Sequence, residues 1–93
     1  MDKYKNNELV EEMDAIILLN DNYADKGLRK GYIGVVVDNL MDLRGFVLVD
    51  CFNPFTGEDI AVLAEIKKED FRVISGSLAD QKLVKQFKDL FRK

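Results

Sequence analysis

Three glycines at three- and four-residue spacing lead directly into a short segment of aromatic and β-branched residues. Gly27, Gly31 and Gly34 punctuate this region, and residues 32–37 have the composition of a strand. A glycine inside a strand allows a bend or bulge, so we expect Gly34 to curve the sheet. The spacing fits neither the Walker phosphate loop nor the dinucleotide fingerprint, and a strand follows where those motifs require a helix. The segment therefore predicts a small curved β-domain and not a nucleotide site.

Further short apolar segments, bounded by turn residues, predict a five-stranded antiparallel domain. The expected strands cover residues 14–19, 32–37, 46–52, 60–66 and 71–74. We expect a long loop over residues 20–31 with Tyr23 and Leu28 as inward anchors, turns over 38–45 and 53–59, and a tight turn over 67–70. Five short strands without a long helix between them are typical of an SH3-like or OB-like barrel. The predicted fold is mainly β (α+β by count), a small SH3-like five-stranded antiparallel barrel.

The last segment changes to the periodicity of a helix. Its apolar stripe and capping signals predict an amphipathic C-terminal helix over residues 77–92. Ser77 is placed as the N-cap, with Asp80 three residues later, and the apolar stripe consists of Leu83, Val84, Phe87, Leu90 and Phe91. We expect this stripe to pack on the barrel, the alternatives being an anionic membrane surface or the groove of a partner protein. The chain is then a single domain over residues 1–93, with a lead-in at 1–13, the barrel at 14–74 and the helix at 77–92.

The net charge of −3 conceals an uneven distribution of charge along the 93 residues. Residues 8–70 carry fourteen acidic and six basic side chains, whereas residues 71–93 carry two acidic and six basic ones. An acidic body repels nucleic-acid phosphates and attracts basic proteins. The charge pattern therefore favours a protein partner with a basic surface and makes nucleic acid an improbable main partner.

The composition offers little for catalysis. The chain has no histidine and a single cysteine, Cys51, so a nucleophile beside a base and a His/Cys metal site are excluded. The paired carboxylates Glu58 and Asp59 are neighbours on a turn or strand, where successive side chains diverge. We expect no catalytic residue, cofactor or metal, and a protein that is not an enzyme. A single cysteine without an intrachain disulfide partner suits the cytoplasm, and no apolar run approaches the roughly 20 residues that span a membrane.

The order of elements and one motif resemble a known family. The pattern Gly27-Leu28-x-x-Gly31-x-x-Gly34-x-Val36-Val37 is similar to that of the small uncharacterised bacterial family known as domain of unknown function 4926. Residues 60–63 and 70–74 match the closing pattern of that family, whereas residues 49–52 depart from its usual third strand. The resemblance covers about residues 14–74 and implies an SH3-like barrel. It implies no activity, because none is established for the family.

Two groups of side chains are candidates for contacting a partner. An aromatic at a turn tip, Phe55, stands beside Glu58 and Asp59, where it could anchor a protein partner if it does not fold back on the barrel. Further acids that could steer a basic partner are Asp38 and Asp42. These five residues are the predicted partner-binding residues. They favour a non-enzymatic protein-binding module, for example an immunity protein that neutralises a toxin domain by occluding a basic surface.

The alternative function is a nucleic-acid- or ribosome-associated accessory domain of SH3-like type. It requires the basic residues of the 20–31 loop and of the C-terminal helix to form one face, namely Lys26, Arg29, Lys30, Lys82, Lys85 and Lys88. The sequence is also compatible with a homodimer formed through an exposed strand edge or through the terminal helix.

Overall fold

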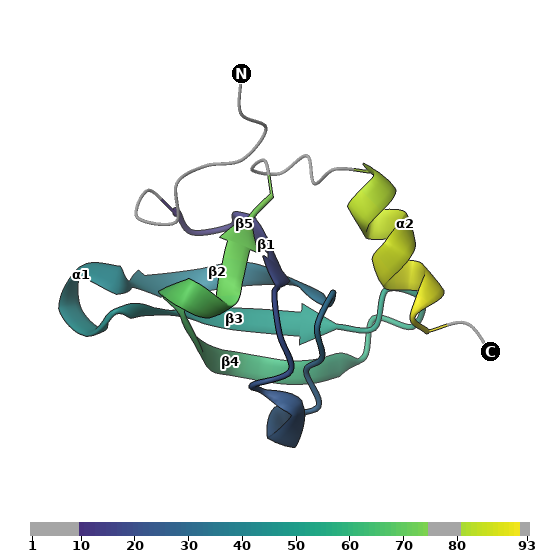
Figure 1. Cartoon of the computed structure of the whole chain (residues 1–93), viewed down its shortest axis with the longest axis horizontal. Coiled ribbons are helices and arrows are strands. Elements are labelled where there is room, and N and C mark those ends of the chain that lie inside the picture. The colour runs from purple at the N-terminus through teal and green to yellow at the C-terminus, as the bar shows by residue number, and fades with distance from the viewer. Residues whose placement is uncertain (1–9, 75–80, 92–93) are drawn as a thin grey trace.

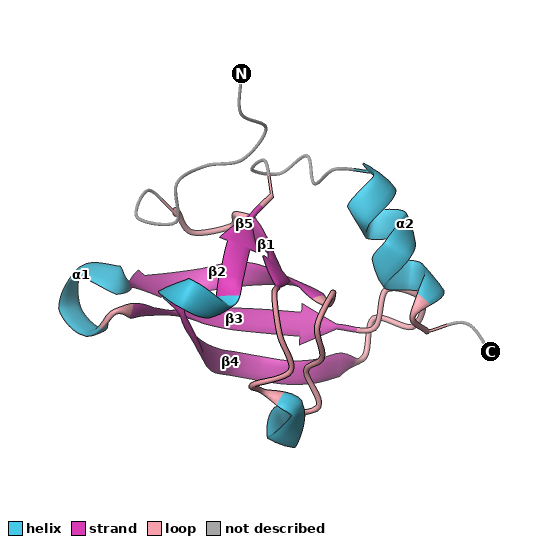
Figure 2. Ribbon diagram, viewed as in Figure 1, coloured by secondary structure: helices cyan, strands magenta, loops and turns pink. Residues whose placement is uncertain are grey.

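A computed structural model describes residues 10–74 and 81–91. Its five strands are β1 (Ala15–Leu18), β2 (Ile33–Leu40), β3 (Phe46–Phe52), β4 (Asp59–Lys67) and β5 (Phe71–Val73). They form one antiparallel sheet in the order β4-β3-β2-β1-β5 (Figures 1 and 2). The predicted mainly β fold with five antiparallel strands is confirmed. Over the described residues the sheet is open, with β4 and β5 at its edges.

Short helices fill the connections between strands. They are η2 (Ala24–Lys26) in the β1–β2 loop, α1 (Met41–Arg44) between β2 and β3, and η3 (Lys68–Asp70) between β4 and β5. The prediction of a turn over residues 38–45 is wrong in its first half, because β2 continues and pairs Asp38 with Leu48 and Leu40 with Phe46. The short helix α1 then makes the connection and ends at Gly45, whose φ of +78° suits a residue without a side chain.

The core lies against one face of β2, β3 and β4, which we call the inner face. Alternate strand residues point into it, including the buried Val36, Val47 and Val49. The long β1–β2 loop crosses in front of this face in Figure 1 and adds the buried side chains of Tyr23 and Leu28. The two predicted inward anchors are therefore confirmed, and the loop covers a core that an isolated sheet would leave open.

The expected role of Gly34 is wrong. Gly34 lies opposite Ile16 in a regular part of the β1–β2 ladder, and the register shifts occur elsewhere, at Val37 in β2 and near Leu63 and Ile60 in β4. A Cβ at position 34 would overlap Cγ1 of Val49 and lie 3.0 Å from the carbonyl oxygen of Asp50. The glycine is needed for close approach of β2 and β3, and the bulges supply the irregularity.

Helix α2 (Gln81–Asp89) packs Phe87 against the core beside Tyr32, just before β2, whereas Val84 is only partly buried and Leu90 is exposed. Phe87 is buried, and its ring lies with those of Tyr32 and Phe91 at centroid distances of 5.2 to 5.5 Å. The predicted amphipathic helix is confirmed over this span. Its expected capping residues Ser77 and Asp80, and residue 92, lie outside the described residues. Among the helices described, none has the length and apolar character needed to cross a membrane.

Candidate protein-interaction surface

The structure divides the five predicted partner-binding residues between two ends of the sheet. Asp38 and Asp42 lie near the tip that joins β2 to β3, where α1 is found, whereas Phe55, Glu58 and Asp59 lie at the turn between β3 and β4 (Figure 1). The seven residues of β3 separate the two ends by roughly 20 Å at the usual rise of a strand. These residues therefore do not form one compact site.

The β3–β4 turn holds Phe55 in solvent. The side-chain Oδ1 of Asn53 accepts hydrogen bonds from the backbone N–H groups of Phe55 (2.8 Å) and Thr56 (3.1 Å), and its carbonyl oxygen accepts one from Gly57 (2.9 Å). These bonds fix the turn, and the side chain of Phe55 remains 54% exposed. Of the two arrangements that the sequence allowed for Phe55, the structure has the exposed one.

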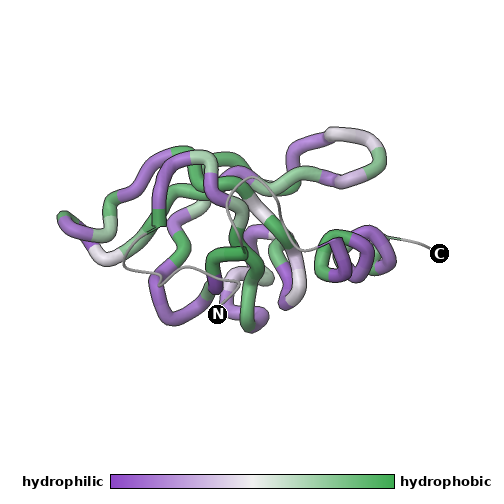
Figure 3. The backbone as a smooth tube through the Cα atoms, turned by 90° about the horizontal axis from the view of Figure 1, so that it is seen from above, coloured by the Kyte–Doolittle hydropathy of each residue, from purple (hydrophilic) through white to green (hydrophobic). Residues whose placement is uncertain are grey.

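A continuous surface runs across the side of β2, β3 and β4 that faces away from the core, which we call the outer face. Leu48 lies between the buried Val47 and Val49, so it points to this face. Its direct strand partners are Asp38 on β2 and Glu65 on β4, and directly opposed residues share a face of the sheet. In the view from above, hydrophilic and hydrophobic residues follow one another along the backbone (Figure 3). The outer face therefore presents an acid at each side of an aliphatic residue.

An irregularity in β4 adds two exposed aliphatic side chains to the outer face. The register shifts so that Val62 and Leu63 both stand opposite Asp50, a β-bulge that we call the β4 bulge. Leu63 has a φ of +54°, and its N–H donates a hydrogen bond of 2.8 Å to Oδ1 of Asp50. Val62 is 57% exposed and Leu63 51% exposed. A non-glycine residue in this left-handed region is strained, and such strain concentrates at functional positions.

Sequence reasoning missed the β4 bulge and its neighbours. Residues 60–66 are almost continuously apolar, and such a run does not reveal which side chains face the core or where the alternation breaks. The acids were the usable signal. Asp50 and Glu65 interrupt apolar strands, and a carboxylate in a strand that is otherwise apolar marks the solvent side.

Asp70 forms the most densely bonded polar cluster among the described residues, and its role is structural. Its buried carboxylate accepts hydrogen bonds from the Tyr23 hydroxyl (2.7 Å), from Asn20 Nδ2 (2.9 Å) and from Asn22 Nδ2 (3.2 Å). The bond from Tyr23 is the main cause of a lowered Asp70 pKa, which burial opposes. The Tyr23 hydroxyl in turn accepts the N–H of Lys67 (2.9 Å). The cluster ties the β1–β2 loop to β4 and η3.

Cys51 is a core residue. Its side chain is buried and its thiol lies 3.2 Å from the carbonyl oxygen of Ile33, to which it donates. Burial raises the pKa of the thiol to about 12, so it stays protonated and unreactive at neutral pH. Within residues 10–74 and 81–91, no group of three or more histidine, cysteine or acidic side chains is arranged to hold a metal ion.

The basic residues do not gather on one described face. Lys26 lies on η2, which stands well apart from α2 in Figure 1. Lys85 and Lys88 are exposed on α2, and Leu90, just after this helix, lies near Gly31 of the β1–β2 loop. The single basic face that the nucleic-acid alternative requires is therefore incomplete.

Comparison with protein-family models, with curated proteins and with solved structures finds no match to this chain. The structure itself defines a class: a small β-rich domain with a covered inner face and an outer face on which exposed aliphatic side chains lie near the carboxylates of Asp38 and Glu65.

Proposed function

We propose that this chain is a non-enzymatic protein-binding module that recognises a basic protein surface with the outer face of its sheet. One observation carries the proposal: the exposed β4 bulge lies on the same face as the carboxylates of Asp38 and Glu65. Exposed aliphatic groups bordered by charge are typical of protein contact sites, where the apolar centre supplies affinity and the charged rim selects the partner.

The two kinds of side chain have separate roles in this proposal. The acids attract a cationic partner over several ångströms and accelerate association, an effect that salt screens. Val62 and Leu63 lose contact with water on binding, at about 25 cal/mol per Å² of apolar area. The hydrogen bond from Leu63 to Asp50 holds the β4 bulge in one conformation before the partner arrives, which reduces the entropy lost on binding.

An immunity protein that neutralises a toxin domain is the concrete form of this proposal. Such inhibitors are small, acidic and free of catalytic groups, and they act by covering a cationic cleft. The exposed Phe55 with Glu58 and Asp59 at one end of the outer face, and Asp42 at the other, would extend the contact along the partner. A rim of this kind adds steering charge around the β4 bulge.

We also infer that the sheet belongs to the SH3-like barrel class and that the protein works in the cytoplasm. Support for the first inference comes from β1, which pairs with both β2 and β5, so that the last strand returns beside the first. The glycine pattern that resembles domain of unknown function 4926 agrees with it. A buried free thiol at Cys51 suits a reducing compartment.

Calorimetric titration against the protein encoded beside this chain's gene tests the function. We expect tight binding that weakens as salt is raised. The variants D38K/E65K and V62S/L63S should each raise the dissociation constant, the first by slowing association and the second by speeding dissociation. The variant E12K/D25K changes the net charge equally at exposed positions outside the outer face and should bind more nearly as the wild type does. Absence of binding, or binding insensitive to both outer-face variants, would contradict the proposal.

A nucleic-acid-associated role is the second candidate, favoured only by the exposed Lys85 and Lys88 on α2. It predicts binding of single- or double-stranded RNA with a steep loss of affinity as salt is raised. A filter-binding assay with K85E/K88E would distinguish the two functions, since that variant should abolish RNA binding but leave the contact of a basic protein with the outer face intact.

A further inference from the structure

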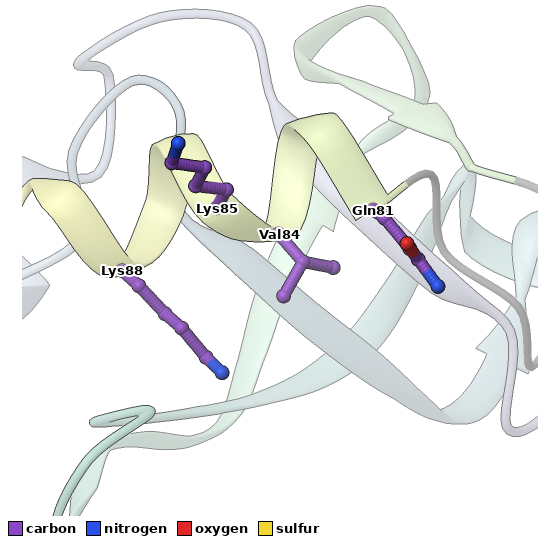
Figure 4. Close-up of a pocket in the computed structure, with 4 residues that line it drawn as sticks. All are labelled: Gln81, Val84, Lys85 and Lys88. Atoms are coloured by element: carbon purple, nitrogen blue, oxygen red, sulfur yellow. The ribbon is translucent and has the colours of Figure 1, made fainter.

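One side of α2 carries a hollow to which two lysines contribute. The hollow has a volume of about 410 Å³, and the described residues that line it are Gln81, Val84, Lys85 and Lys88. They recur at three- and four-residue spacing, so they share one side of the helix. In Figure 4, Val84 and Lys88 project from the same side of α2. The helix thus offers an aliphatic floor with positive charge beside it.

This hollow complements the outer face of the sheet. The outer face has exposed aliphatic side chains in the β4 bulge, with carboxylates at Asp38 and Glu65, whereas α2 has a hollow lined in part by the basic residues Lys85 and Lys88. We propose that the outer face of one copy of this chain docks on the free side of α2 of a second copy, with the β4 bulge in the hollow and the carboxylates facing the lysines.

Helix α2 cannot reach the outer face of its own sheet. A contact between these two complementary surfaces of the chain therefore needs a second copy. Phe87 and Phe91 anchor α2 against Tyr32 at one end of the sheet, and the helix stands beside the strands in Figure 1. Charge excludes the symmetric pairings, since two outer faces would oppose acids to acids and two helices would oppose lysines to lysines. The contact is therefore heterologous, joining two different surfaces.

This inference rests on the proposed function in one respect, the use of the same outer face. A basic partner and a second copy then compete for that face. Self-association keeps the exposed β4 bulge covered until the partner displaces it, so a tight partner needs only to bind the outer face more strongly than α2 does.

Sedimentation velocity of the full chain, over a wide concentration range at low and at physiological salt, tests the self-association. We expect oligomers that grow with concentration and weaken with salt. K85E/K88E should raise the dissociation constant about tenfold or more, because it opposes like charges across the contact. D38K/E65K should do the same from the other side. All four positions are at least partly exposed and outside the core, so both variants should unfold at the wild-type temperature.

Mixing the two variants gives the sharpest measurement. Each variant repels itself, but D38K/E65K and K85E/K88E carry opposite charges on both halves of the contact, so an equimolar mixture should regain association close to that of the wild type. The controls E12K/D25K and K26E/K30E have the same two net charges with both surfaces intact. Each of them should self-associate as the wild type does.

A wild type that remains monomeric at every concentration would overturn the inference, as would K85E/K88E that associates normally or a mixture that stays dissociated. None of these results touches binding of a basic partner, which the calorimetric experiment measures separately. Conversely, a chain that self-associates as described but binds no basic protein would contradict the proposed function and leave the self-association standing.

Discussion

The two faces of β2, β3 and β4 are built from the same strands in different ways. On the inner face, Val36, Val47, Val49 and Ile66 are buried in regular alternation, and the β1–β2 loop closes over them. On the outer face the alternation breaks at the bulges in β2 and β4, which leave aliphatic groups in solvent beside carboxylates. The regular face holds the fold together, and the irregular one is available for a partner.

This difference between the two faces determines whether a mutation should change the stability of the chain or its association with a partner. Tightly packed positions determine the free energy of unfolding, since burial and close packing dominate there. Positions on the outer face lose little on substitution in the isolated chain but contribute to association. The distinction between the faces would fail if an outer-face substitution lowered the free energy of unfolding, or if an inner-face substitution changed association without changing stability.

Gly34→Ala should have the largest effect on stability. Its new Cβ overlaps Val49 Cγ1 and crowds the Asp50 carbonyl oxygen, so β2 and β3 must separate, at a cost of about 3 kcal/mol in the free energy of unfolding by urea. Gly45→Ala is the matched control. It has open space around it but a φ of +78°, and it should cost only about 1 kcal/mol. Equal costs for the two variants would contradict this reading of Gly34.

The same substitution on the two faces comes next in size. Val49→Ala removes buried methyl groups from the inner face and should cost about 2 kcal/mol. Val62→Ala removes the same groups from an exposed position and should cost less than about 0.5 kcal/mol. Urea unfolding of both variants checks the pair. A Val62→Ala variant as unstable as Val49→Ala would mean that the outer face is packed in solution.

Asp70→Asn tests how the β1–β2 loop is held over the inner face. It should lower the free energy of unfolding by about 1–2 kcal/mol, because the hydrogen bonds from Tyr23, Asn20 and Asn22 lose their charged acceptor. The folded-state pKa of Asp70 is lowered, so its contribution is fully present above the ordinary carboxyl pKa of about 3.9 and is lost as pH falls through the folded value.

The pH dependence supplies the control for Asp70. The wild type should lose stability below about pH 4 more steeply than Asp70→Asn, measured as urea midpoints across the acid range. Parallel curves for the two proteins would show that the carboxylate of Asp70 is not held in its charged form by the loop.

Much of the fold could be predicted from sequence, because its signals are local. Apolar runs bounded by turn residues located all five strands, and the spacing of Phe87 and Phe91 located α2. Tyr23 and Leu28 were recognisable as the only large apolar groups in a polar loop. The β2 extension past Asp38 was not, since strand pairing with β3 overrides a local sequence typical of a turn.

The candidate surface was harder to predict because it depends on register. Asp38, Leu48 and Glu65 are far apart in sequence and meet only through the pairing of three strands. A shift of one residue would send each side chain to the other face. The sequence left the exposure of Phe55 open, and hydrogen bonds to the Asn53 side chain in the folded turn decide it. The exposed pair at Val62 and Leu63 follows from a bulge that no residue type indicates.

Leu63→Gly should have the smallest effect on stability, and its value lies in separating stability from binding. Leu63 occupies a left-handed φ of +54°, a conformation that costs an L-residue about 1–2 kcal/mol and a glycine almost nothing. The unfolded chain is more flexible with glycine at this position, and this offsets the strain that the substitution relieves. The free energy of unfolding should therefore stay within about 0.5 kcal/mol of wild type. Glu65→Gly, at a regular position of the same strand, should instead cost about 1 kcal/mol.

If the β4 bulge exists to present Leu63, the Leu63→Gly variant should unfold like the wild type while losing self-association and partner binding. A Leu63→Gly variant as unstable as Glu65→Gly would show that Leu63 supports the fold and not the contact.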